Sequence, residues 1–157
     1  MPITIGQPAP QFTLFDSEKN KINLQDYKGK NVVLLFFPLA FTSVCTRELC
    51  SIRDSISHYN NANAQIFGIS TDSLYTLAKF KNEQQLNFPL LSDYNKEVSA
   101  AYDSLYEIFP SFDMKGVSKR SAFVIDKEGN IVYAEICPTP GDEPHYEAIN
   151  QALARAN

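Results

Sequence analysis

Cys45 is the residue whose type and position point most directly to chemistry. It follows an apolar run over residues 32–37, which ends at Pro38 and has the β-branched and aromatic character of a strand buried on both faces. A helix is predicted to begin near Thr42 or Ser43, because either hydroxyl could cap it. Cys45 then falls in the first turn, where unpaired backbone N–H groups and the positive end of the helix dipole favour a thiolate over a thiol. The sequence therefore predicts a reactive sulfur where a strand gives way to a helix.

A structural role for Cys45 is the alternative, since free cysteine is among the most buried residue types and packs as a small hydrophobic side chain. Its place after a strand, at a helix start and beside hydroxyl groups, favours the nucleophile. The chain also contains Cys50 and Cys137, and a total of three cysteines is too few for a disulfide scaffold in 157 residues. The cysteines are therefore better considered as thiols.

Composition narrows the class of protein. With 44% hydrophobic and 20% charged residues, the chain is most simply one globular domain over residues 1–157. Its net charge of −4 comes without a basic cluster, so neither nucleic acid nor an anionic membrane is an expected partner. The N-terminal segment MPITIGQPAP lacks the pattern of a signal peptide, and no apolar run is long enough to span a membrane. We therefore expect a cytoplasmic protein.

Strand and helix patterns alternate along the chain. The predicted strands cover residues 12–15, 21–23, 32–37, 64–69, 121–125 and 131–136, and the predicted helices cover residues 43–59, 73–85, 95–102 and 143–156. Residues 107–119 are irregular and predict a surface loop, and residues 126–130 give the strongest hairpin signal. Alternation followed by a terminal hairpin predicts an α/β fold of the thioredoxin-like type, with a central mixed β-sheet flanked by α-helices.

Pro38, Thr42 and Cys45 fit the pattern P-x-x-x-T-x-x-C, and residues 6–12 fit G-x-x-A-P-x-F. In these motifs the chain resembles the peroxiredoxins, peroxidases that use a cysteine and neither metal nor haem. The hairpin at residues 126–130 and the proline-rich tail after it extend the resemblance over nearly the whole chain. The sequence of residues 38–49, PLAFTSVCTREL, is most similar to that of the AhpE-like branch. Cys50 is instead similar to the Q-type branch, the bacterioferritin comigratory proteins.

The resemblance implies a thiol-dependent peroxidase, an antioxidant enzyme in which Cys45 is oxidised to a sulfenic acid by hydrogen peroxide or an organic hydroperoxide. It implies that Thr42 contacts the thiolate and the peroxide, besides any capping role, and that Pro38 shields the sulfur, besides ending the strand. Arg120, which alone would read as a solvated charge, matches an arginine of the family that holds the thiolate and orients the peroxide. Glu48 either positions that arginine or is an ordinary acid of a helix start.

A second thiol must then condense with the sulfenic acid, and Cys50, Cys137 and an external thiol all remain open. If Cys50 resolves Cys45, the predicted helix must partly unwind. Ideal helix geometry separates Cα atoms five residues apart by about 8.7 Å, whereas a disulfide needs less than about 7 Å. Cys137 ends a predicted strand, and packing at a sheet edge is its simpler explanation.

The resemblance also implies the partners: a peroxide substrate, a thioredoxin-like or low-molecular-weight thiol as reductant, and a monomer or homodimer. No cofactor is expected, because His58 and His145 form no short-spaced ligand pair with a cysteine. The alternative functions are a thioredoxin-fold redox sensor and a thiol-disulfide oxidoreductase. The latter uses the motif C-x-x-C, and here Glu48 stands where its second cysteine would be.

Overall fold

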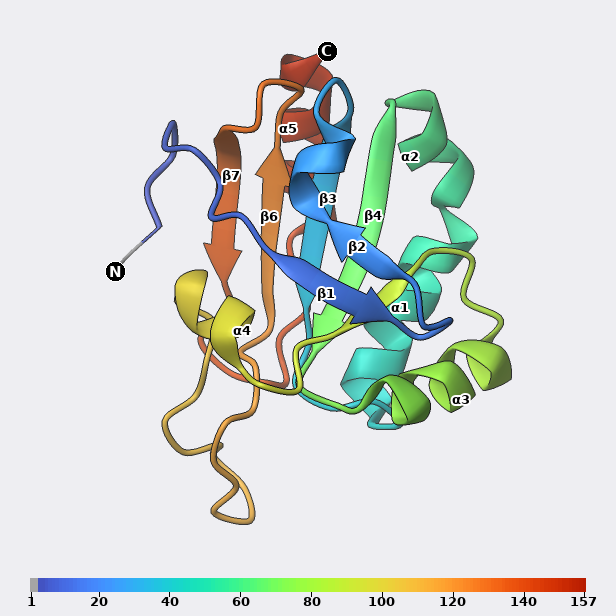
Figure 1. The fold of residues 1–157 in the computed structure, drawn as a ribbon, viewed down its shortest axis with the longest axis vertical. Coiled ribbons are helices and arrows are strands. Elements are labelled where there is room, and N and C mark those ends of the chain that lie inside the picture. The colour runs from blue at the N-terminus through green and yellow to red at the C-terminus, as the bar shows by residue number, and fades with distance from the viewer. Residues whose placement is uncertain (1–2) are drawn as a thin grey trace.

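The apolar run that precedes Cys45 forms the central strand β3 (Asn31–Phe36), and all of its residues are buried. It pairs in parallel with β4 (Ala64–Ser70) and antiparallel with β6 (Ser121–Ile125). These strands belong to a seven-stranded sheet with the order β2-β1-β5-β4-β3-β6-β7. The computed structural model describes residues 3–157 (Figure 1). The predicted mixed sheet flanked by helices is confirmed.

The remaining elements surround this centre. The other strands are β1 (Thr13–Asp16), β2 (Lys21–Asn23), β5 (Leu90–Ser92) and β7 (Ile131–Ile136), and the short 3-10 helix η1 spans Leu24–Tyr27. The helices are α1 (Ser43–Asp54), α2 (Ile56–Asn61), α3 (Leu74–Gln84), α4 (Glu97–Ala101) and α5 (Tyr146–Ala156). The strand β5 was not among the predicted elements. Its three residues, Leu-Leu-Ser, do not show the alternation of apolar and polar residues that indicates a strand.

The sheet separates two hydrophobic clusters, as the alternation of side chains along β3 requires. Val33 and Leu35 pack on one face with residues of α1, α2, α3 and α5. Leu34 and Phe36 pack on the other face with Phe12 and with residues from and beside α4. Cys45 belongs to the first cluster. The helix α1, which carries Cys45, is therefore buried against the face of the sheet that most of the helices cover.

All four predicted helices have different bounds in the structure. Those predicted over residues 73–85 and 95–102 are shorter by one or two residues at each end, and the other two differ more. The helix predicted over residues 43–59 breaks at Ser55, whose N–H bonds to Ile52 O at 3.1 Å, a tighter i−3 contact. The side-chain amide of Asn87 also occupies the carbonyl of Arg53, which favours the break. At the C-terminus, α5 begins at Tyr146 and not at residue 143, because a residue that precedes a proline is disfavoured in the α conformation, and position 144 is proline.

Two predictions concerned the membrane and the N-terminus. None of the helices within residues 3–157 is both long and apolar enough to cross a membrane. Met1 and Pro2, the first residues of the segment in which no signal peptide was recognised, lie outside the described residues.

Candidate active site

The loop between β3 and α1 places Cys45. Pro38 is buried two residues after the end of β3, and the N–H of Ala40 donates to Asp72 Oδ2 at 2.9 Å. The same carboxylate oxygen accepts a hydrogen bond from the Ser70 hydroxyl at 2.7 Å. Asp72 therefore ties the loop after β3 to the end of β4, and the helix start is fixed relative to two central strands.

Thr42 occupies the N-cap position of α1 with extended backbone angles, but its side chain does not cap the helix. Its hydroxyl donates instead to the carbonyl of Leu39 at 2.7 Å. The first N–H groups of a helix have no acceptor within the helix, and the threonine oxygen does not take them. The expectation that a hydroxyl caps this helix is wrong for Thr42. The consequence is a set of free N–H donors next to Cys45, the third residue of α1.

Arg120 is almost fully buried, with an exposed fraction of 1%, and its guanidinium contacts three groups. Its Nη2 atom donates to Cys45 Sγ at 3.1 Å, and its Nη1 atom donates to Glu48 Oε1 at 2.6 Å. The carbonyl of Pro140 accepts from Nη2 at 2.9 Å and from Nε at 3.3 Å. The structure thus brings Cys45, Glu48 and Arg120 together from α1 and from the residue before β6.

Buried serines hold the backbone that leads to Arg120. The Ser99 and Ser118 hydroxyls lie 2.7 Å apart, and the Ser121 hydroxyl donates to Ser104 Oγ at 2.8 Å. Because a buried hydroxyl without a partner is costly, these pairs fix the loop that precedes β6. These serine contacts therefore fix the backbone from which the Arg120 side chain extends toward Cys45.

Glu48 is fully buried, and burial raises its pKa from 4.5 to about 7 although the guanidinium of Arg120 opposes the shift. Its Oε2 atom has no hydrogen-bond partner. For Arg120, burial alone would lower the pKa, but the charges of Glu48 and Cys45 raise it. A thiolate at Cys45 and a carboxylate at Glu48 would share one buried cation, so the two anions compete for it.

Cys50 lies in the same helix as Cys45 but points elsewhere. Its Sγ atom donates to Gln84 Oε1, at the end of α3, at 3.5 Å. Five helical residues turn two side chains about 140° apart, which agrees with one sulfur at Arg120 and the other at α3. All three cysteines are free thiols.

Cys137 lies nearer to the site than its sequence position indicates. Its N–H donates to the carbonyl of Arg120 at 2.8 Å, which makes the two residues direct neighbours across β6 and β7. Burial, followed by the charge of Glu135, raises the pKa of the Cys137 thiol to about 12. This thiol is therefore held protonated next to the cation of the site.

Sequence reasoning missed the carbonyl of Pro140 and the carboxylate of Asp72. A backbone carbonyl carries no signal in its residue type, and the contact between Arg120 and Pro140 joins the two ends of the β6–β7 hairpin. Asp72 follows β4 in a turn, where acids are common, and its partner Ala40 is distant in the sequence. Neither residue could have been selected without the register of the sheet.

Comparison with known proteins decides the family. The model of the AhpC/TSA family matches residues 5–134. A Mycobacterium tuberculosis protein named as a peroxiredoxin is 40% identical over 134 residues, with 85% of each chain covered. The alkyl hydroperoxide reductase E of Mycobacterium bovis is 36% identical, with 97% of each chain covered. This chain is a peroxiredoxin of the AhpC/TSA family.

The solved structures agree with this assignment. The crystal structure of the peroxidoxin BcpB from Mycobacterium tuberculosis covers 99% of both chains with a TM-score of 0.86 and 27% identity. The peroxiredoxin therefore has the predicted thioredoxin-like architecture, and its similarity reaches both the AhpE-like and the Q-type branches. Its activity is that of a thiol-dependent peroxidase. A sulfur at a helix start, in contact with a permanent cation, is the arrangement that this chemistry needs.

Proposed function

We propose that Cys45 is the peroxidatic nucleophile and that Arg120, Thr42 and Pro38 complete its site. The observation that carries this proposal is the hydrogen bond of 3.1 Å from Arg120 Nη2 to Cys45 Sγ. A guanidinium keeps its charge at neutral pH and so stabilises a thiolate at that distance. The free N–H groups at the start of α1 supply further donors for an oxygen that gains negative charge.

The reaction begins when the Cys45 thiolate attacks one oxygen of a hydroperoxide. A sulfur–oxygen bond forms, the oxygen–oxygen bond breaks, and two electrons pass from the sulfur to the peroxide. The leaving oxygen takes the hydroperoxide proton and departs as water or an alcohol, which leaves Cys45 as a sulfenate in equilibrium with its sulfenic acid. Arg120 stabilises the charge on the reacting oxygens, and Glu48 holds the guanidinium in place through its bond of 2.6 Å.

Cys50 is our first candidate for the resolving thiol. Its thiolate would attack the Cys45 sulfenic acid and form a disulfide, and the displaced hydroxide would take up a proton and leave as water. An external thiol reductant would then supply two electrons and return both residues to thiols. The helix must open for this disulfide to form, because Cys50 now contacts Gln84 and not Cys45. Cys137 adjoins the backbone of Arg120, but the raised pKa of its thiol disfavours the thiolate that would attack. An external thiol is the third possibility.

The remaining partners follow from the family. We infer a small hydroperoxide as substrate, hydrogen peroxide or an organic hydroperoxide, and a thioredoxin-like protein or a low-molecular-weight thiol as reductant. We also infer that the protein is a monomer or a homodimer in the cytoplasm.

Stopped-flow oxidation with hydrogen peroxide and several organic hydroperoxides tests this proposal. A peroxidase should oxidise Cys45 at least about a thousandfold faster than a free thiol, which corresponds to about 4 kcal/mol in the activation barrier. A redox sensor without a substrate site would react at the rate of a free thiol with every peroxide. That outcome would remove the proposed roles of Arg120 and Thr42.

A further inference from the structure

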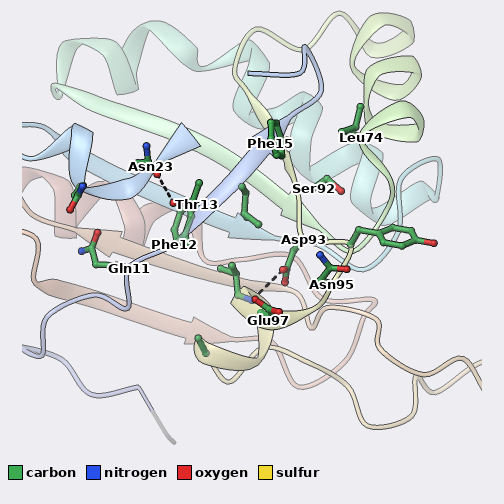
Figure 2. Close-up of a pocket in the computed structure, with 15 residues that line it drawn as sticks. Gln11, Phe12, Thr13, Phe15, Asn23, Leu74, Ser92, Asp93, Asn95 and Glu97 are labelled. Carbon is green, nitrogen blue, oxygen red and sulfur yellow. Dashed lines mark hydrogen bonds between the residues drawn. The ribbon is translucent and has the colours of Figure 1, made fainter. Parts of the chain in front are cut away.

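A cleft unrelated to Cys45 opens between the β1–β2 hairpin and α4 (Figure 2). Its volume is about 700 Å³, and its walls come from β1, β2, the segment that follows β5, and α4. The lining includes Phe12 and Val98, which belong to the hydrophobic cluster on the face of the sheet opposite to Cys45. A molecule in this cleft would therefore leave the thiol site open.

The cleft exposes part of a strand edge. β1 pairs with β5 only at Phe15 and Asp16, with Phe15 opposite Ser92. Along β1 the even positions bond toward β2, because Phe12 O accepts from Leu24 and the Asp16 N–H donates to Asn20 O. The odd positions therefore bond toward the β5 side. At Thr13 that side is the cleft, so its N–H and C=O face open space where β5 has ended.

The hydrogen bonds of Asp93 explain why β5 ends here and does not extend along β1 to Thr13. The Asp93 N–H donates to Ser70 O at 2.7 Å, which bonds this residue to β4 and not to β1. Its carboxylate accepts the N–H groups of Val98 at 3.2 Å and Ser99 at 2.6 Å, which fixes the start of α4. Figure 2 shows Asp93 between Ser92 and Glu97, with the strand of Thr13 on the other side of the cleft. These hydrogen bonds of Asp93 therefore hold the chain away from Thr13 and leave the gap beside β1.

The lining has a definite charge character. None of the residues that line the cleft is lysine or arginine, and its two acids are Asp93 and Glu97. Asp93 is already bonded through both carboxylate oxygens, whereas Glu97 forms none of the ion pairs found among residues 3–157. Two lysines that are not part of the lining lie over its aromatic rings, Lys21 over Phe15 and Lys96 over Tyr94. The lining therefore disfavours an anionic ligand and offers one carboxylate to a cation.

We propose that this cleft binds an extended peptide segment of a partner protein, which adds to β1 at Thr13 and places a lysine or arginine next to Glu97. Main-chain hydrogen bonds to an exposed strand edge give such a peptide its affinity, and alternate side chains give specificity. Phe12, Phe15 and Tyr94 supply apolar and aromatic surface to the lining of the cleft. A small anion would meet the acids Asp93 and Glu97 in the lining and neither lysine nor arginine.

Nuclear magnetic resonance titration tests the proposal with a defined probe, an acetylated and amidated peptide of alternating valine and lysine. The amide of Thr13 should shift on addition of this peptide, together with those around Asn95, while the amide of Cys45 should not. A matched peptide of alternating valine and glutamate should bind at least about tenfold more weakly. Equal binding of the two peptides, or shifts confined to other surfaces, would overturn the proposal.

Variants of Thr13 separate the strand edge from the side chain. Thr13→Pro removes the N–H that faces the cleft, and proline is tolerated where a strand N–H has no partner. Thr13→Val removes the same side-chain bond to Asn23 but keeps the N–H. We expect at least tenfold weaker peptide binding for Thr13→Pro and little change for Thr13→Val, with peroxide consumption unchanged in both. Equal affinities in these two variants would contradict main-chain pairing.

A second pair of variants tests the charge without changing the backbone. Glu97→Gln should weaken binding of the valine–lysine peptide several-fold, whereas Glu107→Gln, on the exposed loop outside the cleft, should not. Equal losses in the two variants would show only a general attraction between unlike charges. If the protein without peptide formed dimers that Thr13→Pro abolished, the occupant would be a second copy of the chain, and the proposed partner would be wrong.

Discussion

Cys45 and Cys137 are two buried thiols beside one guanidinium, and their surroundings are opposite. Cys45 receives a hydrogen bond from Arg120 Nη2 at a helix start. Cys137 adjoins the backbone of Arg120, but its Sγ atom lies 4.0 Å from a carboxylate oxygen of Glu135, and burial raises the pKa of its thiol to about 12. A nearby cation therefore does not by itself make a cysteine reactive. The cation must also donate a hydrogen bond to the sulfur, as Arg120 does to Cys45.

The largest effect is expected when the two cysteines are removed separately. Cys45→Ser should lower the rate of peroxide consumption at least about a thousandfold, because it removes the nucleophile. Cys137→Ser is the matched control and should retain the wild-type rate constant of the first oxidation within about twofold. Stopped-flow kinetics at equal protein concentration measures both. A Cys45→Ser variant that consumed peroxide at the wild-type rate would invalidate the assignment.

Loss of the donor to Cys45 should have the next largest effect. Arg120→Ala should slow peroxide consumption by more than tenfold, equivalent to at least about 1.4 kcal/mol. The rate with an organic hydroperoxide should fall as well, because the same guanidinium stabilises the charge on the reacting oxygens. The variant can fold because Glu48, left without its partner, can take up a proton. Arg155→Ala, at the exposed end of α5, is the control and should change neither measurement.

Glu48 should make the stability of the protein depend on pH. Its pKa is about 7 in the folded chain against 4.5 for a free side chain, so the folded state binds its proton more tightly. Its contribution to the free energy of unfolding is therefore complete below pH 4.5 and is lost as the pH rises to about 7. Urea denaturation across this range should show a fall in the wild type that Glu48→Gln reduces. Parallel curves for the two proteins would mean that Glu48 is already ionised at low pH.

The smallest expected effect concerns the other thiol. Glu135→Gln should lower the pKa of Cys137 but leave it well above the ordinary value, because burial is the larger cause of the shift. The pH dependence of Cys137 alkylation, followed by mass spectrometry in a Cys45→Ser background, measures this change. A return of Cys137 to the reactivity of a free thiol would show that Glu135, and not burial, suppresses it.

Local patterns made part of this molecule predictable. The strands over residues 121–125 and 131–136 have the predicted bounds, since a turn-rich segment between two β-rich runs needs no distant partner. The start of α1 near Ser43 was equally visible. The break at Ser55 was not, because it depends partly on the amide of Asn87 from another part of the chain.

The site divides in the same way. Cys45 stood out because strand, proline and helix start are contiguous in the sequence. The contact of Arg120 with Glu48 depends on how α1 packs beside β6, and the contacts of Arg120 with Pro140 O and with the Cys137 N–H depend on the register of β6 against β7. Register is set by tertiary packing, which a single sequence does not display.

Trapping of the sulfenic acid tests the difference between the two thiols most directly. The reduced wild-type protein would be treated with one equivalent of hydrogen peroxide in the presence of dimedone, digested and mapped by mass spectrometry. The account predicts that the dimedone adduct forms on Cys45, with Cys137 recovered as an unmodified thiol. An adduct on Cys137 while Cys45 stayed reduced would contradict it, because the sulfur bonded to Arg120 would then not be the one that peroxide oxidises.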